Sequence, residues 1–234
     1  MLLRANNITK SFGKRIVLDQ IAFSVREGEI LGLIGPNGAG KTSLFEILAG
    51  LLEADSGEVS IGNEQLASQQ RKQALFYLPD AIRPWPDQTV SWALKFFARL
   101  NGRSAGDALR IAAVLQLTTH SRSRICSLSK GELKRMMLGI ALLVPQRLLL
   151  LDEPFDGLDF RQTQDVMRLL RSHTATGKTL FLSIHQLTDA SRICDRLVLL
   201  SGGRIAGEGT LDELRQKAGV TGDGGLEEVF LALT

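Results

Sequence analysis

The sequence contains little cysteine and no long hydrophobic run. Only 2 of its 234 residues are cysteines, Cys126 and Cys194, and their spacing matches no metal site, so a disulfide framework is excluded and a reduced, cytosolic setting fits. The most apolar stretch, residues 138–151, is interrupted by Pro145 and polar neighbours and is too short to span a bilayer. The first residues, MLLRANNITK, lack the apolar segment of a signal peptide. If the protein acts at a membrane, we therefore expect it to do so through a separate membrane partner.

The chain also has little excess of charge of either sign. The chain has 28 Lys and Arg against 25 Asp and Glu, a net charge of +3, and no dense basic run, so nucleic acid is not an expected partner. Hydrophobic residues make up 44% and charged residues 23%, which excludes a disordered chain and allows a substantial core. No internal repeat or low-complexity linker is visible. The length suits one large domain or two small ones.

The sequence does contain a glycine-rich segment, GPNGAGKT at residues 35–42. It fits the pattern of a phosphate-binding loop and lies between a strand-like segment, residues 29–34, and a helix-like one, residues 42–49. The glycines let backbone N–H groups point at phosphate oxygens, Lys41 reaches the β- and γ-phosphates, and Thr42 can ligate Mg²⁺. The alternative is an accidental glycine-rich turn, which the flanking strand and helix disfavour. The nucleotide-binding residues expected here are Gly35, Pro36, Asn37, Gly38, Ala39, Gly40, Lys41, Thr42 and Ser43.

A second motif, LLLLDE at residues 148–153, combines a buried strand with two acids. Asp152 is expected at the carboxyl edge of a parallel sheet, where such sheets bind ligands, and can hold Mg²⁺ through a water. Glu153 can polarise the water that attacks the γ-phosphate. A strand that ends in two incidental acids is the alternative. The phosphate-binding loop upstream favours the catalytic interpretation.

A third segment, SLSKGE at residues 127–132, has a purely structural explanation when it is taken alone. Ser129 and Glu132 form the S-x-x-E capping box of a helix, and apolar residues follow at helical spacing to form a core face. A capped helix N-terminus is also an anion site, so a functional role is compatible with the same geometry.

The order of the elements predicts an α/β fold. Residues 2–9 and 16–25 look like antiparallel strands, with Gly13 in the turn between them. A stiff loop, Pro84-Trp85-Pro86, starts a helical insertion, and strands alternate with helices from residue 148 onward. We expect a mostly parallel sheet core with a helical insertion from Pro84 to about Cys126.

These motifs together resemble one family. GPNGAGKT, LSKGE, LLLLDEP, FDGLD and the pair Ile184-His185 follow one another in the order found in ABC-transporter ATPase subunits, and the resemblance covers nearly the whole chain. It implies a P-loop NTPase of the ABC type that spans residues 1–234 and uses ATP and Mg²⁺. The implied fold has a mostly parallel sheet core, an antiparallel β-subdomain and a helical subdomain inserted at about residues 84–140. The resemblance also implies a dimer, formed with itself or a paralogous subunit, in which two ATP molecules lie between the phosphate loop of one subunit and the LSKGE of the other.

The resemblance assigns roles to the remaining positions. Phe12 occupies the place of the aromatic ring that stacks on adenine, although it could instead be a core residue. His185 would bond the γ-phosphate and orient the attacking water beside Glu153. The signature motif, Ser129, Lys130, Gly131 and Glu132, would close on the γ-phosphate of the second subunit's ATP. Asp159 matches the loop that links the two sites across the dimer.

The chain departs from the family pattern at three positions. Asp80 stands where glutamine is usual, and we expect it to touch the metal with altered geometry, beside Thr42 and Asp152. Lys130 replaces the first signature glycine, and Glu132 replaces the usual glutamine. Lys130 either adds positive charge near the phosphate or is only solvated.

The C-terminal segments LDELRQKA and LEEVFLALT resemble those of exporter subunits whose permease is a separate polypeptide. We therefore expect an ATPase that powers export of an unidentified substrate from the cytoplasmic face of the membrane. The permease is expected to dock near residues 80–88, which include Trp85, although a core role for Trp85 is the alternative. An importer subunit, a soluble ABC-type ATPase and a regulatory clamp with little turnover remain open.

Overall fold

A mostly parallel sheet lies at the centre of the computed structural model, which describes residues 1–220 and 224–234. Within these residues the sheet has six strands in the order β10-β9-β3-β8-β7-β6. The register pairs β9, β3, β8, β7 and β6 in parallel, and β10 antiparallel to β9. The predicted parallel core is confirmed. The strands are β3 (Ile30–Ile34), β6 (Leu75–Leu78), β7 (Leu148–Asp152), β8 (Thr179–Ile184), β9 (Arg196–Ser201) and β10 (Arg204–Gly209).

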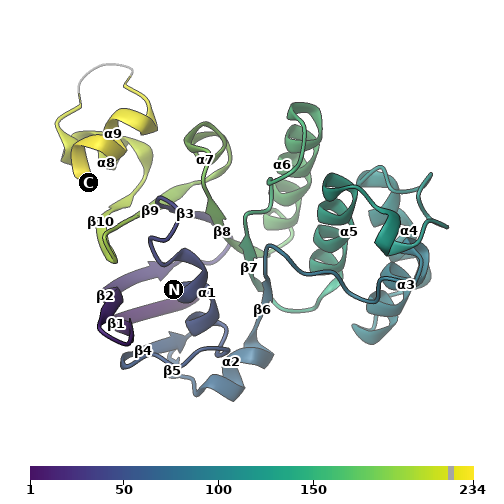
Figure 1. Cartoon of the computed structure of the whole chain (residues 1–234), viewed down its shortest axis with the longest axis horizontal. Coiled ribbons are helices and arrows are strands. Elements are labelled where there is room, and N and C mark those ends of the chain that lie inside the picture. The colour runs from purple at the N-terminus through teal and green to yellow at the C-terminus, as the bar shows by residue number, and fades with distance from the viewer. Residues whose placement is uncertain (221–223) are drawn as a thin grey trace.

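A second sheet is antiparallel and packs beside the first (Figure 1). Its order in the described chain is β2-β1-β4-β5, and the turn between β1 and β2 contains Gly13 with a φ of 60°. The predicted antiparallel β-subdomain is thus confirmed. Its strands are β1 (Leu3–Phe12), β2 (Arg15–Val25), β4 (Ser56–Ile61) and β5 (Glu64–Gln65).

The central sheet is buried on both faces, which explains why its strands are almost continuously apolar. Leu31 and Leu33 pack toward helix α1 (Lys41–Leu48) and the antiparallel sheet. Ile30 and Ile34, which alternate with them, pack toward the helices on the opposite face. Those helices are α5 (Lys130–Leu143), α6 (Phe160–Thr174), α7 (Leu187–Ile193) and α9 (Leu226–Leu233).

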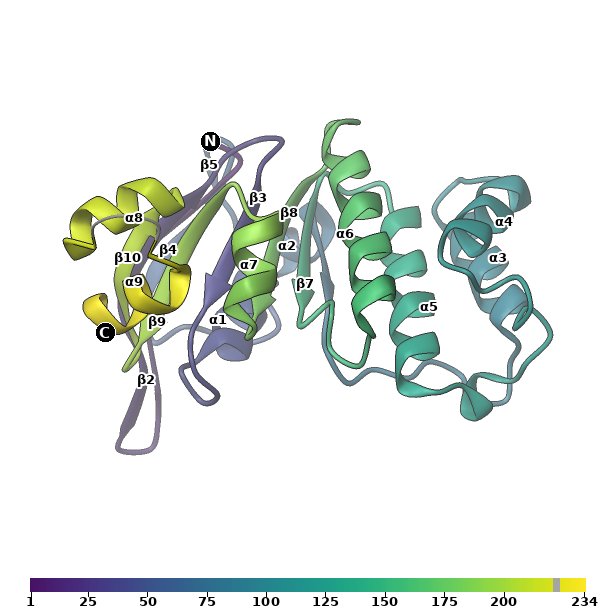
Figure 2. The same cartoon turned by 90° about the horizontal axis from the view of Figure 1, so that it is seen from above.

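The helical insertion forms one end of the molecule, far from α8 (Leu211–Ala218) and α9 in both whole-chain views (Figures 1 and 2). It contains α3 (Val90–Leu100), α4 (Ala105–Val114) and the short turn η1 (Ile125–Ser127), and it packs on α5. Helix α2 (Ser68–Ala74) precedes β6. A Cβ atom on Gly139 of α5 would lie 2.9 Å from Ile111 and 3.1 Å from Leu94, so this glycine permits the close approach of α3 and α4. None of the helices in the described residues combines the length and apolarity that crossing a bilayer requires.

Candidate nucleotide-binding and catalytic site

The glycine-rich segment forms the turn between β3 and α1, but its glycines are required for different reasons. Gly38 and Gly40 have φ values of 80° and 103°, in the left-handed region that side chains disfavour. Gly35 is needed for space, because a Cβ atom there would lie 2.4 Å from the carbonyl oxygen of Leu200 on β9. The motif alone predicts backbone curvature at all three glycines, and only the tertiary contact reveals the role of Gly35.

Lys41 is the first residue of α1 and is only 7% exposed. Its Nζ donates to the carbonyl oxygens of Gly35, at 2.8 Å, and Pro36, at 3.4 Å, and lies 3.7 Å from Oε1 of Glu153. The ammonium group therefore lies inside the curve of the loop, at the positive end of the helix dipole. Anionic oxygens are the groups that this position binds best.

Asp152, at the end of β7, is 3% exposed and accepts hydrogen bonds from three hydroxyl groups. Thr42 Oγ1 donates to Oδ2 at 2.9 Å, Tyr77 donates to the same oxygen at 3.4 Å, and Ser183 donates to Oδ1. Burial, together with the charge of Asp152, raises the pKa of Tyr77, which remains a neutral donor. The sequence motifs predict neither Tyr77 nor Ser183 as a site residue. A serine inside the apolar strand LFLSIH was the local signal for Ser183, and its pairing with Asp152 across β7 and β8 is visible only in the tertiary structure.

Glu153 adopts a left-handed backbone conformation, with a φ of 49°, that a non-glycine residue rarely holds. Its N–H donates to Ser183 Oγ at 2.9 Å, and its carbonyl oxygen accepts from Lys134 Nζ at 3.0 Å. Its carboxylate Oε2 lies 2.6 Å from Nδ1 of His185. Strain of about 1–3 kcal/mol at such a residue persists only where the surroundings hold it, and here contacts hold both its backbone and its side chain.

A cavity of about 410 Å³ brings most of the predicted site residues together. One ring at its edge, Phe12, is 51% exposed, so the alternative that Phe12 is a core residue is wrong. Arg15, which the sequence analysis did not identify, also lines the cavity and adds a positive charge. The predicted residues that line it are Phe12, Asn37, Gly38, Gly40, Lys41, Thr42, Ser43, Asp80, Asp152 and Glu153.

The predicted signature residues lie outside this cavity. Ser129 is the N-cap of α5: its Oγ accepts from the N–H of Glu132, and the Glu132 carboxylate accepts from the N–H of Ser129, so the predicted capping box is confirmed. Asp159 caps α6 by accepting from the N–H of Gln162 at 2.8 Å. A Cβ atom on Gly131 would lie 2.8 Å from the carbonyl oxygen of Gly157, so the start of α5 packs directly on the FDGLD segment.

Lys130 is not merely solvated. Its Nζ lies 2.5 Å from Oδ2 of Asp156 in the FDGLD segment of the same chain. The hydrogen bond from Lys130 lowers the pKa of Asp156, and the same bond raises the pKa of Lys130. Both groups are therefore charged across the physiological range, and the pair joins the start of α5 to the segment that follows β7.

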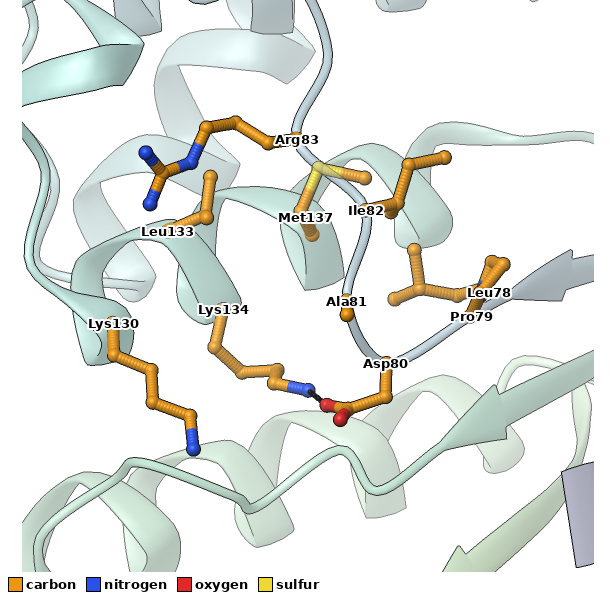
Figure 3. Close-up of a pocket in the computed structure, with 10 residues that line it drawn as sticks. All are labelled: Leu78, Pro79, Asp80, Ala81, Ile82, Arg83, Lys130, Leu133, Lys134 and Met137. Atoms are coloured by element: carbon orange, nitrogen blue, oxygen red, sulfur yellow. Dashed lines mark hydrogen bonds and ion pairs between the residues drawn. The ribbon is translucent and has the colours of Figure 1, made fainter.

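Asp80 lies against Lys134. Its Oδ1 is 2.5 Å from Nζ of Lys134, one turn beyond Lys130 on α5 (Figure 3). The family pattern predicts Asp80 beside the metal, and the apolar spacing after LSKGE predicts a core face, so neither pattern indicates this lysine. The spacing of Lys130 and Lys134, four residues apart on one helix face, was the available signal.

The oxygen donors at the phosphate loop fit Mg²⁺. In the described part of the chain no three His, Cys, Asp or Glu side chains form a cluster that holds a metal by itself. Mg²⁺ is usually held by one or two protein groups together with substrate phosphates, and the Thr42 hydroxyl and Asp152 carboxylate, 2.9 Å apart, supply such a set.

A glycine loop between strand and helix, with an acid at the end of a neighbouring parallel strand, defines a P-loop nucleotide-binding protein. The family model for ABC transporters matches residues 18–156, and the chain belongs to this family of ATP-binding, ATP-hydrolysing domains. Linearmycin resistance ATP-binding protein LnrL of Bacillus subtilis is 31% identical over 98% of this chain and 78% of its own length.

Two further similarities agree with this membership. Nod factor export ATP-binding protein I of Burkholderia orbicola is 37% identical over 87% of this chain and 69% of its own length. A solved ATP-binding subunit of an ABC transporter superposes with a TM-score of 0.89 at 30% identity, covering 100% of this chain and 99% of its own. The predicted family, fold class and ATPase activity are confirmed.

Proposed function

We propose that this ATPase powers export of a substrate through a separate membrane permease, and that it works at the cytoplasmic face of the membrane. The name of one relative, Nod factor export ATP-binding protein I, supports the direction of transport, and the linearmycin resistance protein LnrL is compatible with it. The whole chain, residues 1–234, would act as one nucleotide-binding domain with a helical subdomain at about residues 84–140. The substrate would be selected by the permease.

The observation that carries the catalytic proposal is the position of Glu153 beside the phosphate loop. Its Oε1 lies 3.7 Å from Lys41 and its Oε2 lies 2.6 Å from His185. Lys41 and the N-terminus of α1 would bind the β- and γ-phosphates, Phe12 would stack on adenine, and Glu153 would accept the proton of the attacking water while His185 orients it. Mg²⁺, held by Thr42 and Asp152, would neutralise charge on the phosphate oxygens.

A dimer would complete the site. Ser129 and Gly131 lie at a capped helix N-terminus, which is an anion site, but they do not line the cavity of their own chain. We infer that they bind the γ-phosphate of the ATP held by a second subunit, either a copy of this chain or a paralogue. Lys130 and Glu132 belong to the same signature segment, and Asp159 would link the two sites across the dimer. ATP binding would close the two subunits, and hydrolysis would reopen them.

The permease would dock in a groove of about 230 Å³ between the end of β6 and α5 (Figure 3). Trp85 follows the groove-lining Arg83 closely in the sequence and is 44% exposed. Its ring contacts Trp92, Phe96 and Phe97 at centroid distances of 5.2–5.6 Å. Exposed aromatic clusters of this kind are typical of protein interfaces. Leu133 and Met137 give the groove an apolar floor, and Arg83 and Lys130 line it as well.

The test is Mg·ATP hydrolysis by the purified chain and by Glu153→Gln, with the oligomeric state followed as ATP is added. We expect turnover by the wild type, a loss of about 10²–10⁴-fold in the variant, and a stable ATP-bound dimer of the variant. Glu53→Gln, at an exposed carboxylate outside the site, is the matched control. Equal rates for wild type and Glu153→Gln would overturn the assignment.

ATP-induced dimers with little wild-type turnover would favour a regulatory clamp, and co-purification with a permease from detergent extracts separates a transporter from a soluble ATPase.

A further inference from the structure

Lys134 is a buried cation that joins three parts of the site. It is 6% exposed and belongs to α5, yet its Nζ lies 2.5 Å from Oδ1 of Asp80, after β6, and donates to the carbonyl oxygen of Glu153, after β7, at 3.0 Å. An ammonium group has three donors and no acceptor, so two of its three hydrogen bonds are made to these oxygens. Figure 3 shows the side chain of Lys134 crossing the groove to Asp80.

The pairing accounts for the acid at position 80. A buried ammonium group is costly unless a charged partner compensates it, and an amide side chain supplies no charge. Asp80 supplies that charge through Oδ1, the oxygen that contacts Lys134. The two charged side chains, Asp80 and Lys134, therefore form one complementary ion pair.

Lys134 also holds the backbone of Glu153 in its strained conformation. The φ of 49° is maintained by the bond from its N–H to Ser183 on one side and by the bond from Lys134 to its carbonyl oxygen on the other. Without Lys134, the carbonyl oxygen retains the N–H of Asp156, at 3.2 Å, as its remaining partner. With this restraint lost, the strained backbone of Glu153 relaxes more readily, which moves the carboxylate away from the phosphate loop.

We propose that Lys134 is a positioning residue for Glu153, and that Asp80 acts by orienting Lys134 and not as a metal ligand. The inference rests on the proposed catalytic role of Glu153. Asp80 and Lys134 both line the groove proposed for the permease, so a partner that moves α5 relative to β7 changes the orientation of the catalytic carboxylate. The pair is thus a direct physical connection between docking and hydrolysis.

The kinetic test compares Lys134→Met, Lys134→Arg, Asp80→Asn and the double variant Lys134→Met/Asp80→Asn. We expect kcat to fall about 10–100-fold in Lys134→Met with a nearly unchanged KM for ATP, because small displacements of a catalytic group cost about that much. Lys134→Arg, which keeps a cationic donor, restores part of the lost kcat. The double variant loses little more than Lys134→Met, because the two residues act as one unit. Lys72→Met, at an exposed lysine of α2, is the control.

Two further readouts separate positioning from the alternatives. The Mg²⁺ concentration for half-maximal rate stays the same in Asp80→Asn, whereas an increase of about tenfold, absent from Lys134→Met, would identify a metal ligand and overturn the proposal. Amide exchange measured without nucleotide should accelerate at residues 153–157 in Lys134→Met while the core of α5 remains protected. An unchanged exchange rate at residues 153–157 would also overturn the proposal. Amide exchange does not depend on turnover, so it tests the inference even if the wild type hydrolyses no ATP. A lack of hydrolysis by the wild type would contradict the proposed function and not this inference.

Discussion

Nδ1 of His185 lies 2.6 Å from Oε2 of Glu153, although helix α6 and strand β8 separate the two residues in the sequence. The contact exists because β7 and β8 are parallel neighbours, so that the residues following each strand emerge at the same edge of the sheet. Its geometry orients the glutamate carboxylate toward the phosphate loop, where Oε1 of Glu153 lies 3.7 Å from Nζ of Lys41.

His185→Ala should lower kcat more than it weakens ATP binding, because the histidine contacts the catalytic carboxylate and lies outside the cavity that receives the nucleotide. A loss of about 10–100-fold in kcat is expected for a displaced catalytic group. Steady-state hydrolysis and equilibrium binding of a fluorescent ATP analogue measure the two effects. His173→Ala is the matched control, since that ring bonds a carbonyl oxygen within α6. A drop in affinity with kcat unchanged would contradict the assignment.

Phe12→Ala should weaken ATP binding with little change in stability. Stacking of a base on an aromatic ring contributes about 1–3 kcal/mol, which corresponds to a roughly 5- to 150-fold increase in Kd. The ring is 51% exposed, so its loss leaves no core cavity. Calorimetric titration with ATP checks this, with Phe12→Tyr expected to bind normally. Ile16→Ala, at a side chain 59% exposed on the next strand, is the control.

Gly35→Ala should be far more damaging than Gly38→Ala. At Gly35 the added methyl group would lie 2.4 Å from a backbone oxygen of β9, which has no freedom to move, so both the loop and the sheet edge must distort. At Gly38 no atom lies within 4 Å of the added group, and the cost is the left-handed φ alone, about 1 kcal/mol. Urea unfolding of the two variants measures the difference. Equal destabilisation would show that space beside Leu200 is not the constraint.

The Lys130–Asp156 pair should contribute stability over a wide pH window. The hydrogen bond from Lys130 lowers the pKa of Asp156 below 3.8. The pair therefore contributes to the free energy of unfolding above pH 3.8, and this contribution is lost as the pH falls through the pKa of Asp156 in the folded state. The pKa of Lys130 is raised above 10.5, so on the alkaline side the contribution is present below pH 10.5 and is lost as pH rises through the folded-state value. Urea unfolding of wild type and Lys130→Gln should therefore differ by a constant amount between pH 5 and 9, and converge in acid. Convergence already at neutral pH would show that the pair contributes nothing.

Trp85→Ala should uncouple the ATPase from its permease while basal hydrolysis continues. The ring contacts Trp92, Phe96 and Phe97, and neither Trp85 nor these three neighbours line the nucleotide cavity. Co-purification with the permease and transport in reconstituted vesicles measure the effect. Leu109→Ala, at a side chain 58% exposed on α4, is the control. Intact partner binding and transport in Trp85→Ala would rule out the proposed docking surface.

Local motifs were predictable because each carries its own geometry. The phosphate loop, the strand that ends in Asp152 and the capping box of Ser129 and Glu132 depend on residues within a few positions of one another, and each formed as expected. The alternation of strands and helices also indicated the parallel sheet. The serine at position 183 was visible, but its partner was not, because the pairing of β7 with β8 is a tertiary property.

The sequence by itself determined the chemistry of the protein: a glycine loop for phosphates, oxygen ligands for a hard cation, and a carboxylate that can accept a proton. Only the tertiary structure decided which groups those side chains contact. Asp80 and Lys134 are 54 positions apart, and they meet because α5 packs over the end of β6. A charged side chain pairs with the counter-charge that packing brings near it, so the partners of Asp80, Lys130 and Glu153 follow from the arrangement of elements and not from spacing along the chain.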